Sequence, residues 1–214
     1  FYSVTHVGFY NQANKWTTMG SNLIQSTILE VAQPVLHDAA DEGGRQKRVF
    51  RKMLRFTSFL GFPALLGLAF VSREFILITV TGKWLESVPL MQVLCCCSIA
   101  FPVGQLCLNL TVARGRSGLV LRNSVLFGLA QIALVCLMHP YGILAMTCAF
   151  GCASLLWMLL WMLAVRREIG LRLREAFLDM APYAACAALS IAVAHLATRA
   201  VENLWLLFAA KIAV

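Results

Sequence analysis

Long apolar runs separated by short basic clusters constrain this chain more than any other feature. Six stretches reach or approach the roughly 20 residues that a helix needs to cross a bilayer: residues 17–36, 56–81, 89–113, 119–138, 141–165 and 181–198. A seventh, truncated run covers residues 204–214. Backbone amides in hydrocarbon must be satisfied within the segment, and the runs lack the alternation of barrel strands. We therefore predict an all-α, polytopic transmembrane helix bundle, with residues 1–214 as a single membrane-embedded domain.

The composition excludes an ordinary soluble domain. Hydrophobic residues make up 60% of the 214, and charged residues only 13%. A soluble domain is roughly half apolar and a quarter charged, so this chain has too little polar surface to face water. The net charge of +8 is divided among short clusters between apolar runs. That distribution favours membrane topology over nucleic-acid binding, and we expect no nucleic acid partner.

The basic residues alternate from one connection to the next. Thirteen Lys and Arg side chains lie in or beside the loops 37–55, 114–118 and 166–180, whereas the alternate connections hold four. Basic loops stay on the cytoplasmic side of a membrane. The pattern therefore predicts that these three loops are cytoplasmic and that residues 1–16 lie outside.

Neither a metal site nor a catalytic group is indicated. The cysteines lie inside apolar runs without histidines at ligand spacing, which is typical of small packing residues: Cys95, Cys96, Cys97, Cys107, Cys136, Cys148, Cys152 and Cys186. No nucleotide-binding loop, metal-binding helix or nucleophile elbow is recognisable. We expect no cofactor, no metal, no catalytic residue and no enzymatic activity.

The first span carries a polar face. At 100° per residue its polar side chains gather on one side, opposite Ile24 and Ile28. Such a helix either lines a water-accessible cavity, forms a polar seam with its neighbours or lies flat in the interface. We favour the cavity, and its candidate residues are Asn22, Gln25, Ser26, Glu30 and Gln33.

Glu30 is the one acid that we place well inside a predicted span. An ionisable group at that depth is normally paired, protonated or part of an ion path. The alternative is that the helix is shifted and Glu30 reaches the inner surface near Asp38. Weaker polar candidates, which we expect to form interhelix hydrogen bonds, are Gln92, Gln105, Asn109 and Gln131.

The basic loop before the second span predicts contact with lipid. Its first role is topological anchoring against anionic lipid, and a contact with phosphorylated head groups is a possible addition. The residues expected to make that contact are Arg48, Arg51 and Arg55. The prolines give further expectations: Pro34, Pro63 and Pro102 should kink their spans or loosen the local hydrogen-bond ladder, and Pro89 and Pro182 should open the third and sixth spans.

Several short motifs, in this order, resemble the bacterial polysaccharide and lipopolysaccharide flippases of the multidrug/oligosaccharidyl-lipid/polysaccharide exporter superfamily. Gly8–Trp16 is similar to the outer loop before the second helix of their C-terminal lobe. Further matching segments follow at similar spacing: Gln33–Leu36, Phe50–Arg55 with Phe62-Pro63, Gly82–Trp84 with Pro89 and Gln92, and Ala113–Ser117. The resemblance covers residues 8–122 by motif and the remainder by hydropathy.

The resemblance implies a function. Such a protein carries a lipid-linked oligosaccharide across the bacterial inner membrane by alternating access between two lobes. The chain begins without Met and ends within an apolar run, so we expect a C-terminal-lobe fragment whose partners are membrane lipids and a missing N-terminal lobe. The fragment alone should be inactive. The alternatives are a small-molecule or drug exporter of the same superfamily, or a membrane-embedded glycan-processing enzyme.

Overall fold

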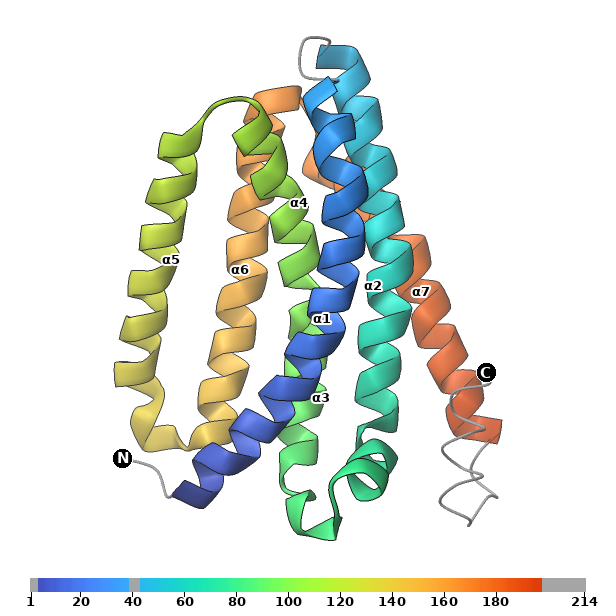
Figure 1. The fold of residues 1–214 in the computed structure, drawn as a ribbon, viewed down its shortest axis with the longest axis vertical. Coiled ribbons are helices and arrows are strands. Elements are labelled where there is room, and N and C mark those ends of the chain that lie inside the picture. The colour runs from blue at the N-terminus through green and yellow to red at the C-terminus, as the bar shows by residue number, and fades with distance from the viewer. Residues whose placement is uncertain (1–3, 39–42, 198–214) are drawn as a thin grey trace.

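The computed structural model describes residues 4–38 and 43–197, and every regular element within these ranges is a helix (Figure 1). The long helices are α1 (Val4–Asp38), α2 (Gly43–Thr79), α3 (Ser87–Ser98), α4 (Ala100–Ala113), α5 (Ser117–Met138), α6 (Ile143–Ile169) and α7 (Leu173–Ala197). Single 3-10 turns, η1 (Gly82–Trp84) and η2 (His139–Tyr141), precede α3 and α6. The predicted all-α bundle is confirmed. The predicted seventh run, 204–214, lies outside the described residues.

Among the described residues, five helical segments are long and apolar enough to cross a membrane: α2, α3 with α4, α5, α6 and α7. α1, which contains the predicted first span 17–36, is not among the five. The chain is therefore a multi-pass membrane protein.

Three helices begin well before the predicted spans. α1 starts at Val4 rather than 17, so the residues compared with an outer loop are helical. In the other two, the charged first turns belong to the same continuous helix. α2 starts at Gly43 rather than 56, and α7 starts at Leu173 rather than 181. Pro182 consequently lies inside α7, and the prediction that it opens a span is wrong.

The third span is broken into two helices, as Pro102 predicts. The helical assignment is interrupted at Ile99, between α3 and α4. Pro102 has no backbone N–H to donate, and its ring crowds the carbonyl of Ser98, four residues earlier. The interruption is confined to Ile99, whose backbone angles stay in the right-handed helical region, and α3 with α4 still forms one membrane-length segment. α2, by contrast, continues through Pro63 without a break.

The helices run up and down, and their connections separate cleanly by charge (Figure 1). The turn from α4 to α5 and the loop from α6 to α7 lie at one end, beside the start of α2. The two 3-10 turns and the start of α1 lie at the other end. The three basic segments of the sequence thus share one end of the bundle, which we call the basic end.

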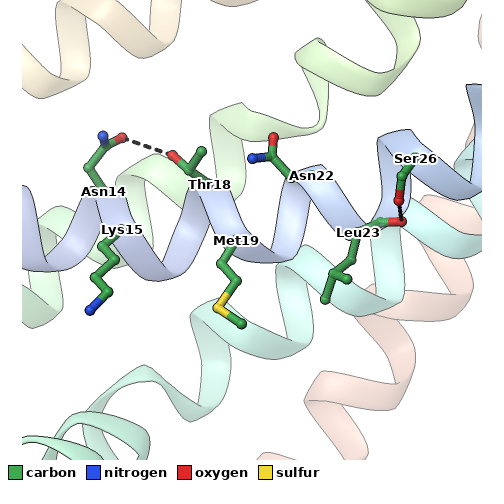
Figure 2. A pocket seen from close by; sticks show the side chains of 7 residues that line it. All are labelled: Asn14, Lys15, Thr18, Met19, Asn22, Leu23 and Ser26. Carbon is green, nitrogen blue, oxygen red and sulfur yellow. Dashed lines mark hydrogen bonds between the residues drawn. The ribbon is translucent and has the colours of Figure 1, made fainter.

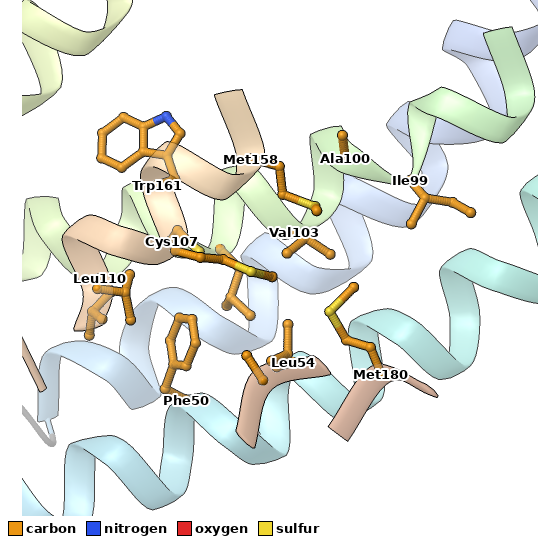
Figure 3. Close-up of a cluster of buried hydrophobic side chains, with 14 of the residues drawn as sticks. Phe50, Leu54, Ile99, Ala100, Val103, Cys107, Leu110, Met158, Trp161 and Met180 are labelled. Carbon is orange, nitrogen blue, oxygen red and sulfur yellow. The ribbon is translucent and has the colours of Figure 1, made fainter. Parts of the chain in front are cut away.

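The main core lies toward the basic end and joins α2, α4 and α6 (Figure 3). Leu54, Val103 and Trp161 are fully buried there. α1 packs across α2, α3 and α4, whereas α5 lies at one edge and α7 at the other (Figure 1). No residue of α5 is buried, and leucines along it are exposed. Such an apolar outer surface is what a lipid environment requires.

Candidate functional site

A polar groove runs along α1, the helix that the sequence singled out. Asn14, Thr18, Asn22 and Ser26 recur every four residues and therefore lie on one face of it (Figure 2). The groove has a volume of about 580 Å³ and is open along its length. Thr18 Oγ1 donates to Asn14 Oδ1 at 3.4 Å. Lys15, Met19 and Leu23 line the groove as well, so its surface combines hydrogen-bonding and apolar groups.

The opposite face of α1 packs into the bundle. Ile24 and Ile28 are 4% and 3% exposed and belong to the main core. The predicted burial of Ile24 and Ile28 is therefore confirmed, but the two faces are mixed. Thr17 and Ser21 are buried on the inner side, whereas Met19 and Leu23 are exposed beside the polar residues. The burial of the isoleucines holds the groove-lining face away from the core.

A second cavity, of about 270 Å³, adjoins the groove and is enclosed by several helices. α1 contributes Tyr10, Asn14, Thr18, Ser21, Asn22 and Gln25. The facing wall consists of Leu94, Cys97 and Ser98 from α3, Phe101 from α4, Gln131 from α5, and Phe150, Gly151 and Ser154 from α6. We call this space the α1–α6 cavity. None of the described residues that line it carries a charge.

The α1–α6 cavity brings together some predicted residues and not others. Asn22 and Gln25 line it, and Gln25 Nε2 lies 3.1 Å from Ser21 Oγ. Ser26 lines only the open groove. Glu30 is exposed and belongs to neither lining, so its proposed ion-path role stays a prediction. The side chain of Gln33 lies outside the described part of the structure.

Sequence reasoning missed the residues that the other helices contribute. Ser98 is 6% exposed and Ser154 5%, and both lie among mainly apolar side chains of α3 and α6. A lone serine in a span carries little signal, because it also bonds its own helix, as Ser154 does to the Phe150 carbonyl at 2.9 Å. Gln131 was expected to bond a neighbouring helix; it lines the cavity, and its hydrogen bond to a neighbouring helix stays a prediction.

Close backbone contact shapes the cavity wall. A Cβ atom placed on Gly151 of α6 would lie 2.4 Å from Cys97 Sγ of α3. Gly104 of α4 is similarly close to the Trp157 ring, at 2.8 Å. The absence of a side chain at these two glycines lets α6 approach α3 and α4, as small residues do in membrane helix packing.

Two of the three arginines expected to meet lipid are paired with a buried acid at the basic end. Arg51 and Arg55 both donate to the Asp179 carboxylate of α7, with their shortest contacts at 2.6 Å. Lys47 reaches Glu175 at 2.8 Å. Arg48 is exposed. Lipid contact by Arg48, Arg51 and Arg55 stays a prediction, because the structure contains no lipid to test it.

A second ion-pair group joins α2, α4 and α6 at the same end. Arg114 donates two hydrogen bonds to Gln46 Oε1, at 2.8 and 2.6 Å. Arg116 Nη1 lies 2.9 Å from Glu168 Oε1, and only 1% of the Glu168 side chain is exposed. Sequence reasoning treated these arginines as topological signals alone. The acids lie far away in the sequence, so nothing local indicated the pairing.

Comparison with known proteins places this architecture in context. Residues 1–89 match a family described as "Polysaccharide biosynthesis protein". The chain is similar to an uncharacterized membrane protein in the cps region of Klebsiella pneumoniae. The two are 33% identical over 105 residues, which are 47% of this chain. The chain is also 29% identical over 109 residues, or 51% of its length, to the lipopolysaccharide biosynthesis protein WzxC of Escherichia coli. Over these stretches the chain is similar to bacterial proteins named for polysaccharide or lipopolysaccharide biosynthesis. The resemblance predicted from its motifs is confirmed.

Other relatives agree in sequence or in fold. The teichuronic acid biosynthesis protein TuaB of Bacillus subtilis is 28% identical over 139 residues, 63% of this chain. The matched stretches make up 22% of each of the first two relatives and 29% of TuaB. The fold superposes on the lipid II flippase MurJ, in an inward closed conformation, with a TM-score of 0.82 at 16% identity. That match covers 100% of this chain and 45% of MurJ.

Proposed function

We propose that the protein to which this chain belongs moves a lipid-linked oligosaccharide across the bacterial inner membrane during polysaccharide or lipopolysaccharide biosynthesis. The observation that carries the proposal is the polar groove and α1–α6 cavity within a bundle whose outer surface is apolar. A sugar head group loses its hydrogen bonds to water when it enters hydrocarbon, at several kcal/mol for each unpaired polar group. A hydrogen-bonding cavity at membrane depth offsets that penalty.

The proposal includes a second lobe. Alternating access requires two bodies that rock about a shared site, and the described helices pack into one bundle. The fold match extends over 45% of the MurJ chain, which supports one lobe of a two-lobe transporter. In this proposal the basic end faces the cytoplasm, residues 1–16 lie outside, and the chain performs no covalent step.

Thiol accessibility of α1 in the membrane tests the proposed cavity. Asn22→Cys, Gln25→Cys and Gln33→Cys, each in a cysteine-free background, should react with a water-soluble maleimide. Ile28→Cys is the matched control, because Ile28 is 3% exposed on the buried face of the same helix, and it should react far more slowly. If none of the three polar positions reacts faster than Ile28→Cys, there is no water-filled cavity along α1.

Export by the encoded protein tests the function itself. Expression in a strain that lacks its own polysaccharide flippase should restore surface glycan. Restored resistance to organic cations without restored glycan would instead identify a drug exporter of the same superfamily.

A further inference from the structure

We propose that the α1–α6 cavity binds the sugar portion of the transported molecule, as an uncharged glycosyl group, and leaves the diphosphate outside. This inference rests on the proposed transport function and adds which part of the substrate this lobe holds. It follows from the chemistry of the lining, from the size of the cavity and from where the nearest positive charges lie.

The lining is built from amides and hydroxyls. Asn22, Gln25 and Gln131 offer both donors and acceptors, and Ser98 and Ser154 offer hydroxyls from the facing wall. Sugar hydroxyl groups are also donors and acceptors at once, so this set matches them group by group. The Ser154 hydroxyl donates to its own helix, which leaves its oxygen free to accept.

Aromatic rings complete a surface suited to a sugar. Tyr10, Phe101 and Phe150 line the same cavity from three different helices. A pyranose ring has apolar C–H faces as well as polar edges, and such faces pack on aromatic rings. Amides beside aromatic rings therefore fit a carbohydrate better than they fit a purely polar or a purely apolar ligand.

A diphosphate does not fit the same lining. Phosphate oxygens are bound in proteins by Arg and Lys through charge-assisted hydrogen bonds, and a buried charge without such partners is strongly disfavoured. None of the described lining residues of the cavity is charged. The nearest cation in the adjoining groove is Lys15, which is exposed near the outer end and lies 5.6 Å from the centre of the Trp16 ring.

The volume limits the ligand further. At about 270 Å³ the cavity lies just below the range of about 300–1,000 Å³ that is usual for small-molecule sites. We therefore expect it to hold a short part of the glycan and not a complete oligosaccharide. The remaining sugars would extend into the open groove along α1, which shares Asn14, Thr18 and Asn22 with it.

A native cysteine reports on occupancy. Cys97 lines the α1–α6 cavity, whereas its neighbour Cys96 lines an apolar groove beside α7. We would compare two variants of the encoded protein in membrane vesicles. One keeps only Cys97 and the other keeps only Cys96, with every other cysteine replaced by serine or alanine. The measured quantity is the rate of reaction with a water-soluble maleimide.

Two probes distinguish sugar from phosphate. The first is the repeat oligosaccharide of the producing strain, released from its lipid carrier by mild acid, and the second is inorganic pyrophosphate. We expect the oligosaccharide to slow labelling of Cys97, pyrophosphate to leave it unchanged, and neither to alter labelling of Cys96. Gln131→Ala, on the loosely packed α5, should raise the half-protecting oligosaccharide concentration roughly 2- to 10-fold.

Each contrary result has one meaning. Protection of Cys97 by pyrophosphate but not by the oligosaccharide would overturn the inference in favour of a phosphate site. So would a Cys97 that stays unlabelled while Asn22→Cys reacts, since the cavity would then be closed to water. Failure of the wild-type protein to restore glycan export would instead remove the proposed function, and this assay does not depend on which group occupies the cavity.

Discussion

Asp179 of α7 and Arg51 of α2 form a two-pronged ion pair, with Arg51 Nε 2.6 Å from Oδ2 and Nη2 3.0 Å from Oδ1. Arg55, one turn further along α2, adds two more bonds to Oδ1. α7 packs mainly on α2 and hardly on α6. The Asp179 carboxylate therefore attaches the edge helix to the bundle at the basic end.

Replacing Asp179 should loosen α7. We expect Asp179→Ala to lower the free energy of unfolding by about 1–3 kcal/mol, because four charge-assisted hydrogen bonds are lost while the two arginines regain water. Reversible unfolding in mixed micelles measures this change. Arg48→Ala, at an exposed position of the same helix, should change stability by less than about 0.5 kcal/mol. Equal effects of the two substitutions would contradict the role given to Asp179.

In the second ion-pair group, removing the more exposed partner, Arg116, should cost more stability than neutralising the buried partner, Glu168. Arg116→Ala leaves the Glu168 carboxylate buried, with only the longer 3.8 Å contact to Arg114, and we expect a loss of about 2–3 kcal/mol. Glu168→Gln removes the buried charge, so its loss should be below about 1 kcal/mol. The double variant should resemble Glu168→Gln alone. A larger loss for Glu168→Gln than for Arg116→Ala would show that the carboxylate is not effectively buried.

Gly151 should not tolerate a methyl group. The Cβ of Gly151→Ala would lie 2.4 Å from Cys97 Sγ and 3.0 Å from its Cβ, so α3 and α6 must move apart, with a loss of about 1–3 kcal/mol. Cys97→Ala in the same chain should recover part of it by removing the sulfur. Gly128 of α5 has open space around it, and Gly128→Ala should be neutral or stabilising by up to about 1 kcal/mol.

The basic end should face the cytoplasm. In a cysteine-free background, Tyr141→Cys in η2 should react with an impermeant maleimide in intact cells, since Tyr141 is 72% exposed at the opposite end. Ser117→Cys, in the turn among the arginines, should react only after the membrane is permeabilised. Labelling of both positions in intact cells would refute the predicted topology.

Much of the fold could be predicted because the signal is local. Apolar runs, the arginines beside each loop and the break caused by Pro102 all depend on residues within a few positions of one another. The polar face of α1 was equally readable, since helix geometry alone assigns Asn22 and Ile24 to different sides. The predicted start of the sixth span was wrong because it, too, rested on local signals alone. The charged residues before Pro182 look like a loop until Asp179 is seen to pair with α2.

The α1–α6 cavity was only half predictable. Asn22 and Gln25 stood out on a helix with an unusual polar stripe, whereas Ser98, Gln131 and Ser154 lie among mainly apolar side chains of their helices. Their convergence depends on the close approach of α6 to α3 at Gly151. A glycine in a span does not indicate which helix it will meet.

By itself, the sequence determined that this chain crosses a membrane as helices, where the apolar part of most of those helices lies and which connections carry the positive charge. Hydrocarbon requires each segment to satisfy its own backbone hydrogen bonds, so these properties depend on short stretches of chain. Only the tertiary structure decided which polar side chains share a cavity and which arginines meet Asp179 and Glu168. Those contacts join residues as many as 128 positions apart, and their geometry depends on how whole helices pack.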